Sequence, residues 1–196
     1  MCSSDLDSLA TPSPGREPAR RAIDLWRGIF EQDRIEANPI LTRAFAWLES
    51  HLPETDLVTL VHADYRSGNY LHDGEGRITA MLDWEMAHLG DPHEDLGWAA
   101  MPYWSSGGRI CGLLPLDEFV ARWEAATGFR ADRARLRFYQ VLGTAKMMTI
   151  ALTGVRNLCE ARTCEPTLAI VGLLNGRLAR ELLELMDVAP VAGARS

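Results

Sequence analysis

Residues 61–98 of this chain read VHADYRSGNYLHDGEGRITAMLDWEMAHLGDPHEDLGW, and this stretch decides the fold. Two apolar segments, 69–72 and 77–82, flank the four residues Asp73–Gly76, which include two glycines. Apolar segments on either side of a glycine-containing turn are typical of a β-hairpin, because glycine adopts the positive φ angles of tight turns at little cost. The stretch therefore predicts a hairpin that folds about residues 74–76.

Three polar residues come together at the open end of this predicted hairpin. Pairing of its arms sets Asn69 opposite residues 81–83, so Asn69 and Asp83 become neighbours, with directly opposed Cα atoms about 4.5 to 5.5 Å apart. Asp64 lies in the loop after a buried strand predicted over 57–61 and can reach the same end. Amide and carboxylate oxygens are ligands that Mg²⁺ accepts, with phosphates and water completing its coordination. Three oxygen-bearing side chains around Mg²⁺ are the groups that phosphoryl transfer needs, a reaction in which an aspartate orients the acceptor hydroxyl.

Amphipathic helices account for most of the remaining sequence. Apolar residues recur at three- and four-residue steps over 23–30 and again over 40–48, and Pro39 suits the first turn of the second helix. Four more helices are expected after the hairpin, at about 92–101, 117–127, 132–156 and 166–187. Residues 1–15, rich in Ser, Thr and Pro, are interpreted as a flexible tail or the end of a linker. The predicted fold class is therefore α+β, mainly helical, with residues 16–196 as one unit.

Composition places the chain among globular proteins and disfavours several partners. Its 196 residues are 47% hydrophobic with a formal net charge of −7, which excludes disordered and collagen-like classes. An acidic balance without long runs of like charge argues against nucleic acid or an anionic membrane as the main partner. Four cysteines without CxxC spacing, no signal peptide and no membrane-spanning segment predict reduced thiols in a cytoplasmic protein. Among 20 basic side chains only Lys146 is a lysine, so chemistry that needs a phosphate-anchoring lysine must use it or lack that part.

Three linked motifs make a resemblance to a known family specific. They are His62-x-Asp64-x-x-x-x-Asn69, then Leu82-Asp83-Trp84-Glu85, then Gly90-Asp91-Pro92-x-x-Asp95-Leu96. In this order and spacing they resemble the aminoglycoside phosphotransferase family, part of the protein-kinase-like superfamily that also holds the choline kinases. The longer segment that contains the last two motifs, LDWEMAHLGDPHEDLGW, is most similar to the phosphotransferase domains fused to some acyl-CoA dehydrogenases.

The resemblance implies a kinase that transfers the γ-phosphate of ATP to a hydroxyl group of a small molecule. Asp64 would be the catalytic-loop aspartate, and Asn69 and Asp83 would be ligands of Mg²⁺. The family pattern also implies that Asp91 braces the catalytic loop, while His62 is expected to be a packed, hydrogen-bonded residue. The expected fold is the C-terminal lobe of a protein-kinase-like fold, with the metal site on its small hairpin.

The sequence departs from that family in two places. Position 63 is alanine where the family commonly has glycine, so the backbone there must avoid a positive φ or bear strain. The residues before His62 read as a tail and two helices, with no glycine-rich strand turn and no lysine, so the N-terminal ATP lobe is expected to be absent. The chain is then expected to be a truncated phosphotransferase, and the face left by the missing lobe would favour self-association.

Two other functions stay open at this point. A catalytically inert lone lobe would act as a binding module or be a gene remnant. A metal-dependent hydrolase would use His62, Asp64, His72 and Asp73, although the last two abut the predicted turn and no HxH pair exists. The acceptor is not encoded by any single residue. Candidate contacts for a cationic acceptor, otherwise solvated surface acids, are Glu118, Glu124, Asp132 and Glu160.

Overall fold

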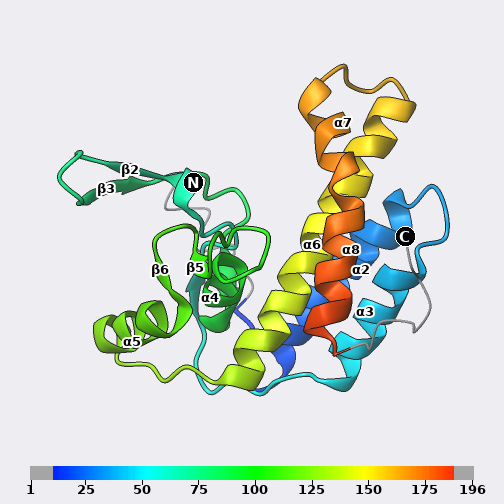
Figure 1. The fold of residues 1–196 in the computed structure, drawn as a ribbon. Helices are drawn as coiled ribbons and strands as arrows, with labels where there is room; N and C mark the ends of the chain where they lie inside the picture. The colour runs from blue at the N-terminus through cyan, green and yellow to red at the C-terminus, as the bar shows by residue number, and fades with distance from the viewer. Residues whose placement is uncertain (1–10, 188–196) are drawn as a thin grey trace.

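Helices make up most of residues 11–187, the part of the chain that the computed structural model describes (Figure 1). Four of them lie side by side as a bundle: α2 (Glu17–Asp33), α3 (Pro39–Ser50), α6 (Arg133–Cys159) and α8 (Asn175–Leu185). The short helix α7 (Pro166–Leu173) stands at the top of this bundle in Figure 1. Helices α4 (His93–Ala99) and α5 (Leu116–Thr127) and three small sheets lie on the other side of α6.

The two amphipathic helices predicted before the hairpin are α2 and α3, and both are confirmed. Asn38 caps α3 by accepting a hydrogen bond from the backbone N–H of Leu41 at 3.0 Å, which gives a partner to an amide that the helix itself leaves free. The buried faces of the two helices meet at Phe30 and Phe45, whose ring centroids are 5.9 Å apart. Residues 1–10 of the predicted tail lie outside the described residues, and Gly15 pairs with Thr55 in an antiparallel bridge.

Helix α6 joins two apolar clusters. Its residues Phe138, Leu142 and Met148 belong to the larger cluster, which α2, α3 and α8 complete. Its residue Leu136 belongs to a smaller cluster with side chains of α4 and α5. A helix that is buried on more than one side is typical of the centre of a protein. Helix α6 is therefore the element against which both halves of the fold pack.

Two glycines let α4 and α6 approach closely. A Cβ placed on Gly97 of α4 would lie 2.5 Å from Cβ of Tyr139, and one placed on Gly143 of α6 would lie 2.7 Å from Sδ of Met101. Contacts that short are sterically forbidden, so these positions accept only glycine without a shift of their surroundings. The close crossing brings Trp98 of α4 against Lys146 of α6.

The single helix predicted over 166–187 is wrong, because the structure divides it into α7 and α8. The backbone turns at Leu174, whose N–H bonds to the carbonyl of Val171, three residues back, and not to the carbonyl four residues back as in an α-helix. Gly172 and Gly176 stand on either side of this turn, and glycine weakens a helix by leaving its backbone with more freedom to lose.

Three two-stranded antiparallel sheets complete the fold. They are β1 (Thr59–Val61) with β4 (His88–Gly90), β2 (Tyr70–His72) with β3 (Ile78–Met81), and β5 (Arg109–Ile110) with β6 (Leu114–Pro115). The second sheet is the predicted hairpin, and it projects from the body of the molecule in Figure 1. The sequence does not predict β4, because a three-residue strand carries too little periodicity to be recognised.

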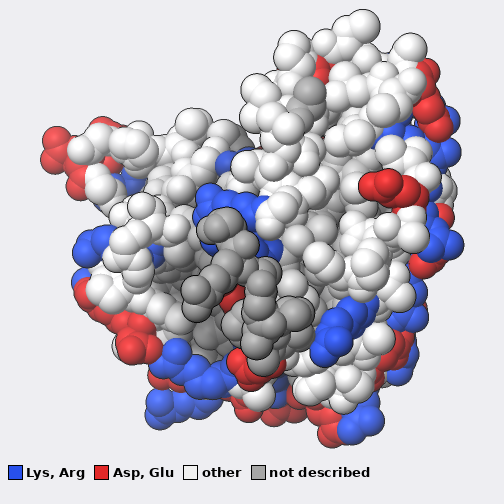
Figure 2. All heavy atoms as spheres, turned by 45° about the vertical axis from the view of Figure 1, so that its right-hand side comes forward, with Lys and Arg blue, Asp and Glu red and all other residues white. Residues whose placement is uncertain are grey.

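Charged side chains of both signs are interspersed over the face seen in Figure 2. Two ion pairs join elements: Arg27 of α2 with Glu49 of α3, and Arg156 of α6 with Asp33 at 3.0 Å. Surface pairs of this kind each contribute little to stability. Within residues 11–187 no helix is long and apolar enough to cross a membrane.

Candidate functional site

The candidate site lies where β1 ends and the hairpin opens. Residues 62–69, here called the Asp64 loop, leave β1 and end in a 3₁₀ turn, Ser67–Asn69, that leads into β2. The hairpin returns to the same place, because the N–H of Leu82 donates to the carbonyl of Asn69 at 2.8 Å. Leu82 is thus the direct partner of Asn69, and Asp83 is one residue beyond it.

Asp64 and Asn69 form a buried hydrogen-bonded pair. Nδ2 of Asn69 donates to Oδ2 of Asp64 at 2.5 Å and to its backbone carbonyl at 2.9 Å. Both side chains are largely withdrawn from solvent, with exposed fractions of 7% for Asp64 and 5% for Asn69. The 3₁₀ turn between them brings the two residues together although five positions separate them.

Two further donors fix the other oxygen of the Asp64 carboxylate. The indole Nε1–H of Trp98 donates to Oδ1 at 2.9 Å, and Nε of Arg66 lies 3.2 Å from the same atom. The guanidinium of Arg66 also lies 5.1 Å from the ring centroid of Trp104, a cation–π distance. The sequence alone did not mark Trp98 as a site residue; its only signal is a position one helical turn after Asp95 in the third motif.

His62 is packed and hydrogen-bonded, in agreement with the expectation from its sequence position. It is 3% exposed, and its Nδ1 accepts the N–H of Asp64 at 3.2 Å. The ring proton therefore belongs on Nε2, which donates to the carbonyl of Leu82 at 2.8 Å. His62 thereby ties the Asp64 loop to the strand end that carries Asp83.

Asp95, rather than Asp91, braces the Asp64 loop. The carboxylate of Asp95 accepts the N–H of His62 at 2.9 Å and that of Ala63 at 2.8 Å. Burial raises the pKa of Asp95, and these two backbone donors oppose that rise. The carboxylate of Asp91 instead accepts the N–H of His93 at 2.9 Å, at the start of α4. The bracing function implied for Asp91 is therefore wrong, since it is Asp95 that accepts the backbone N–H groups of the loop, while Asp91 bonds to His93.

Ala63 adopts the positive φ that its alanine side chain disfavours. Its φ is 65°, so the loop bears the strain that the sequence allowed as one of two outcomes. The carbonyl of Ala63 accepts a hydrogen bond from Nζ of Lys146, the sole lysine of the sequence. Lys146 is 3% exposed, and its burial lowers the pKa of the amine, an effect opposed by the charges of Glu94, Asp64 and Asp95.

Asp83 is exposed and has free oxygens. Its φ is 65°, a conformation that aspartate tolerates better than most residues, and within residues 11–187 its carboxylate makes no hydrogen bond or ion pair. Because Asn69 directs its Nδ2 to Asp64, its Oδ1 has no hydrogen-bond partner in the described part of the chain. Two side chains with unbonded oxygen atoms, Asn69 and Asp83, thus lie at one end of the hairpin, where these oxygens could coordinate a cation.

The residues proposed for a hydrolase do not gather into a metal site. His72 and Asp73 lie at the turn of the hairpin, where each accepts backbone N–H groups: that of Gly74 at 3.1 Å and that of Glu75 at 2.8 Å, respectively. Among the residues that the structure describes, no group of three or more His, Cys, Asp or Glu could hold a metal ion. The four candidate acids for a cationic acceptor make local contacts, such as Glu118 with Arg122 at 2.7 Å.

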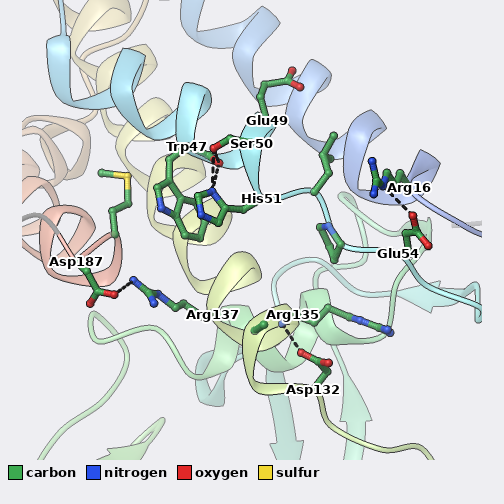
Figure 3. Close-up of a pocket in the computed structure, with 14 residues that line it drawn as sticks. Arg16, Trp47, Glu49, Ser50, His51, Glu54, Asp132, Arg135, Arg137 and Asp187 are labelled. Atoms are coloured by element: carbon green, nitrogen blue, oxygen red, sulfur yellow. Dashed lines mark hydrogen bonds and ion pairs between the residues drawn. The ribbon is translucent and has the colours of Figure 1, made fainter.

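Two cavities border these elements. One of about 460 Å³ adjoins Ala63 and Lys146 and is walled by apolar side chains of α2 and of residues 85–89. Another, of about 610 Å³, lies between the end of α3, the start of α6 and the end of α8 (Figure 3).

The larger cavity contains none of Asp64, Asn69 and Asp83, and of the four candidate acids only Asp132 lines it. In it Trp47 stacks on His51 with ring centroids 4.0 Å apart, and Arg16 and Arg137 face the carboxylates of Glu54 at 3.0 Å and Asp187 at 2.5 Å (Figure 3). Arg135 pairs with Asp91, outside the cavity lining, at 3.7 Å. Cations that are already paired leave little charge for an anionic ligand.

Residues 3–139 match the phosphotransferase enzyme family. The chain is 33% identical to acyl-CoA dehydrogenase family member 11 of Gallus gallus over 164 residues, which cover 75% of this chain and 21% of that protein. It is 31% identical to acyl-CoA dehydrogenase family member 10 of Mus musculus over 103 residues, which cover 51% of this chain and 10% of that protein. The chain therefore spans about a fifth or less of these relatives.

Several solved aminoglycoside phosphotransferases share this fold. A candidate aminoglycoside phosphotransferase of Ralstonia eutropha superposes with a TM-score of 0.78 at 22% identity, over 94% of this chain and 59% of that chain. A thermostable mutant of APH(4)-Ia in complex with ADP and hygromycin B gives a TM-score of 0.58 at 18% identity, over 99% of this chain and 61% of that chain. Spectinomycin phosphotransferase APH(9)-Ia, in complex with ADP and spectinomycin, gives 0.55 at 15% identity, over 96% and 60%.

Proposed function

Because this chain belongs to the phosphotransferase enzyme family, we propose that it transfers the γ-phosphate of ATP to a hydroxyl group of a small molecule. In this proposal Asp64 orients the acceptor hydroxyl and takes its proton, while Asn69 and Asp83 hold Mg²⁺. The observation that carries the proposal is the buried pair of Asp64 and Asn69 beside the open carboxylate of Asp83.

The contacts of Asp64 suit a residue that must hold a substrate hydroxyl in one place. Trp98 and Arg66 bind Oδ1 and Asn69 binds Oδ2, so the carboxylate has a single orientation. Phosphoryl transfer depends mainly on positioning and charge neutralisation, and a base must lie within hydrogen-bond reach of the proton that it takes. A carboxylate fixed by three donors meets the first of these needs.

The available donors fit Mg²⁺. Oδ1 of Asn69 and the carboxylate of Asp83 are hard oxygen ligands without protein partners among residues 11–187. Magnesium is usually held by one or two protein groups together with phosphate oxygens and water, rather than by a cage of side chains. When bound, the ion would neutralise charge on the transferred phosphate.

The described residues supply the catalytic and substrate lobe in this proposal, and a further lobe supplies the remaining nucleotide contacts. Support comes from the coverage of the solved relatives, of which the chain spans 59% to 61%. Two of those structures contain ADP. Further support comes from Lys146, which is bonded to Ala63 inside the protein and so is not available to anchor phosphates.

Replacing Asp64 or Asp83 by alanine tests the proposal. In a preparation that turns over ATP with an alcohol or aminoglycoside, each change is expected to lower kcat by at least about 100-fold, because a base or an electrostatic contact is lost. Release of ADP and the ³¹P spectrum of the product measure the rate.

The matched control is Glu75→Ala, which removes an exposed carboxylate at the far end of the same hairpin. It is expected to keep the rate of the unmodified chain. Turnover near that rate in Asp64→Ala or in Asp83→Ala would contradict the assignment of that residue.

A second candidate function is a binding module that makes no phosphate ester. It is favoured by the burial of Lys146, since no other lysine exists in the sequence to hold the ATP phosphates. Isothermal titration with MgATP, and separately with a panel of aminoglycosides and alcohols, distinguishes the two. Binding of an alcohol or aminoglycoside without turnover supports the module, whereas turnover abolished by Asp83→Ala excludes it.

A further inference from the structure

The strained residue of the site is Ala63, next to Asp64. Its φ of 65° lies in the left-handed region, where a Cβ is crowded by the adjacent carbonyl, and its side chain is 3% exposed. A buried non-glycine residue keeps such a conformation only when its surroundings hold it there. The groups that bond to its backbone therefore decide where the next residue, Asp64, points.

Two charged side chains hold the backbone of Ala63 from opposite sides. Asp95 of α4 accepts its N–H at 2.8 Å, and Lys146 of α6 donates from Nζ to its carbonyl. Hydrogen bonds in which one partner is charged are about twice as strong as neutral ones. Their two helices meet where Gly97 and Gly143 permit close packing, so the holding groups are set by the core of the protein.

Lys146 also contacts the residue that orients Asp64. Its Nζ lies 4.4 Å from the ring centroid of Trp98 and 5.1 Å from that of Trp26. Trp98 donates its indole N–H to Oδ1 of Asp64. The ammonium group thus touches two neighbours of Asp64, the backbone carbonyl of Ala63 and the ring of Trp98, without touching the carboxylate itself.

We propose that Lys146 is a positioning residue, which together with Asp95 holds Ala63 in the left-handed conformation and so orients the Asp64 carboxylate. The geometric part of this inference stands on the contacts above, while its consequence for catalysis rests on the proposed phosphotransferase function. It assigns the sole lysine of the sequence to holding the loop and not to binding phosphate.

The test combines Lys146→Met with Ala63→Gly. Glycine adopts a positive φ at little cost, so it removes the strain that Lys146 is proposed to hold. Lys146→Met is expected to lower the folded-to-unfolded ratio by up to about 5- to 30-fold less with Ala63 present than with glycine there, because only the alanine releases strain when Lys146 is lost; this is the range that one left-handed alanine implies. Urea unfolding of the full chain and its three variants measures this difference.

Two further readouts separate positioning from simple stabilisation. The ¹H–¹⁵N resonance of the Trp98 indole, assigned with Trp98→Phe, reports its bond to Asp64 without any need for activity. It is expected to move in Lys146→Met and to return when Ala63→Gly is added. In a preparation with turnover, kcat is expected to fall about 10-fold or more with KM nearly unchanged, and Ala63→Gly is expected to restore it.

Thr149→Val is the matched control. Thr149 is a fully buried polar residue of α6 whose hydroxyl bonds only to the carbonyl of Ala145, among the described residues. Its effect on stability is expected to be the same whether position 63 is alanine or glycine. If neither chain with Lys146→Met folds, the same comparison is made with Lys146→Gln.

The inference is overturned if Lys146→Met has equal effects on both backgrounds, or if the Trp98 resonance does not move. Coupling between positions 63 and 146 in stability and in the Trp98 resonance supports it, with or without turnover. Coupling of the two positions in a preparation that shows no turnover would count against the proposed function and leave the positioning of the loop established.

Discussion

His88 and Glu94 form an ion pair close to Lys146, with His88 Nε2 at 3.2 Å from Glu94 Oε2. Burial of the imidazole lowers the pKa of His88, but the charge and hydrogen bond of Glu94 outweigh it and raise that pKa to about 9. Burial likewise raises the pKa of Glu94, and the charge of His88 outweighs it and leaves that pKa lowered. The pair is therefore charged over a wider pH range in the folded protein than in the unfolded chain.

A group whose pKa is raised on folding stabilises the protein below its unfolded pKa and loses that effect as the pH rises through its folded pKa. For His88 the stabilisation is expected in full below pH 6.5 and is lost towards about pH 9. The difference in unfolding free energy between the native chain and His88→Gln is expected to shrink by about 1 kcal/mol over this window, a figure reduced because the pair is partly solvated. Urea unfolding at a series of pH values measures it, and a difference that does not change with pH would contradict the assignment.

At the scale of elements, the contact of α4 with α6 controls the site. Helix α4 supplies Asp95 and Trp98, and α6 supplies Lys146, so three side chains that bond to the Asp64 loop depend on one helix crossing. That crossing depends on Gly97, which faces Tyr139 with no space for a Cβ.

Gly97→Ala is expected to destabilise the protein by about 1 to 3 kcal/mol, because a methyl group is forced against a packed helix. The new Cβ would lie 2.8 Å from the carbonyl carbon of Tyr139, which belongs to the backbone and cannot turn aside. Gly28→Ala in α2 is the control, since nothing lies within 4 Å of its added Cβ. It is expected to stabilise the chain by about 0.5 to 1 kcal/mol through helix propensity. Chemical denaturation compares the two, and equal effects would exclude the proposed close packing.

At the scale of the whole molecule, α6 makes the two apolar clusters one folding unit. Leu136 packs in the smaller cluster and Phe138, two residues later, in the larger. A continuous helix of 27 residues cannot unfold at one of these positions without disturbing the other. Self-association, by contrast, stays a prediction, which sedimentation velocity over a range of concentrations would test.

We therefore expect a single unfolding transition. Far-UV circular dichroism follows all helices, whereas tryptophan fluorescence combines Trp26 and Trp47 beside the larger cluster with Trp123 beside the smaller one. The two signals are expected to change at the same denaturant concentration, as in two-state unfolding. Separate midpoints would show that the clusters unfold independently.

The sequence by itself determined the hairpin and the helices α2 and α3. It also determined that Asp64, Asn69 and Asp83 lie near the same end of the hairpin. These features depend on short-range regularities: glycines in a turn, apolar residues at helical spacing, and a β-register counted from that turn. The family motif placed the same three residues, and the structure brings Asn69 into contact with Asp64.

Only the tertiary structure decided which distant side chains hold the Asp64 loop. Trp98 is 34 positions from Asp64, and Lys146 is 83 positions from Ala63, and no periodicity relates them. The division of α7 from α8 and the short strand β4 were likewise not predicted from the sequence. The physical reason is that local spacing sets which face of a helix is apolar, whereas the crossing of α4 over α6 depends on how their surfaces fit, and that crossing brings Asp95, Trp98 and Lys146 to the site.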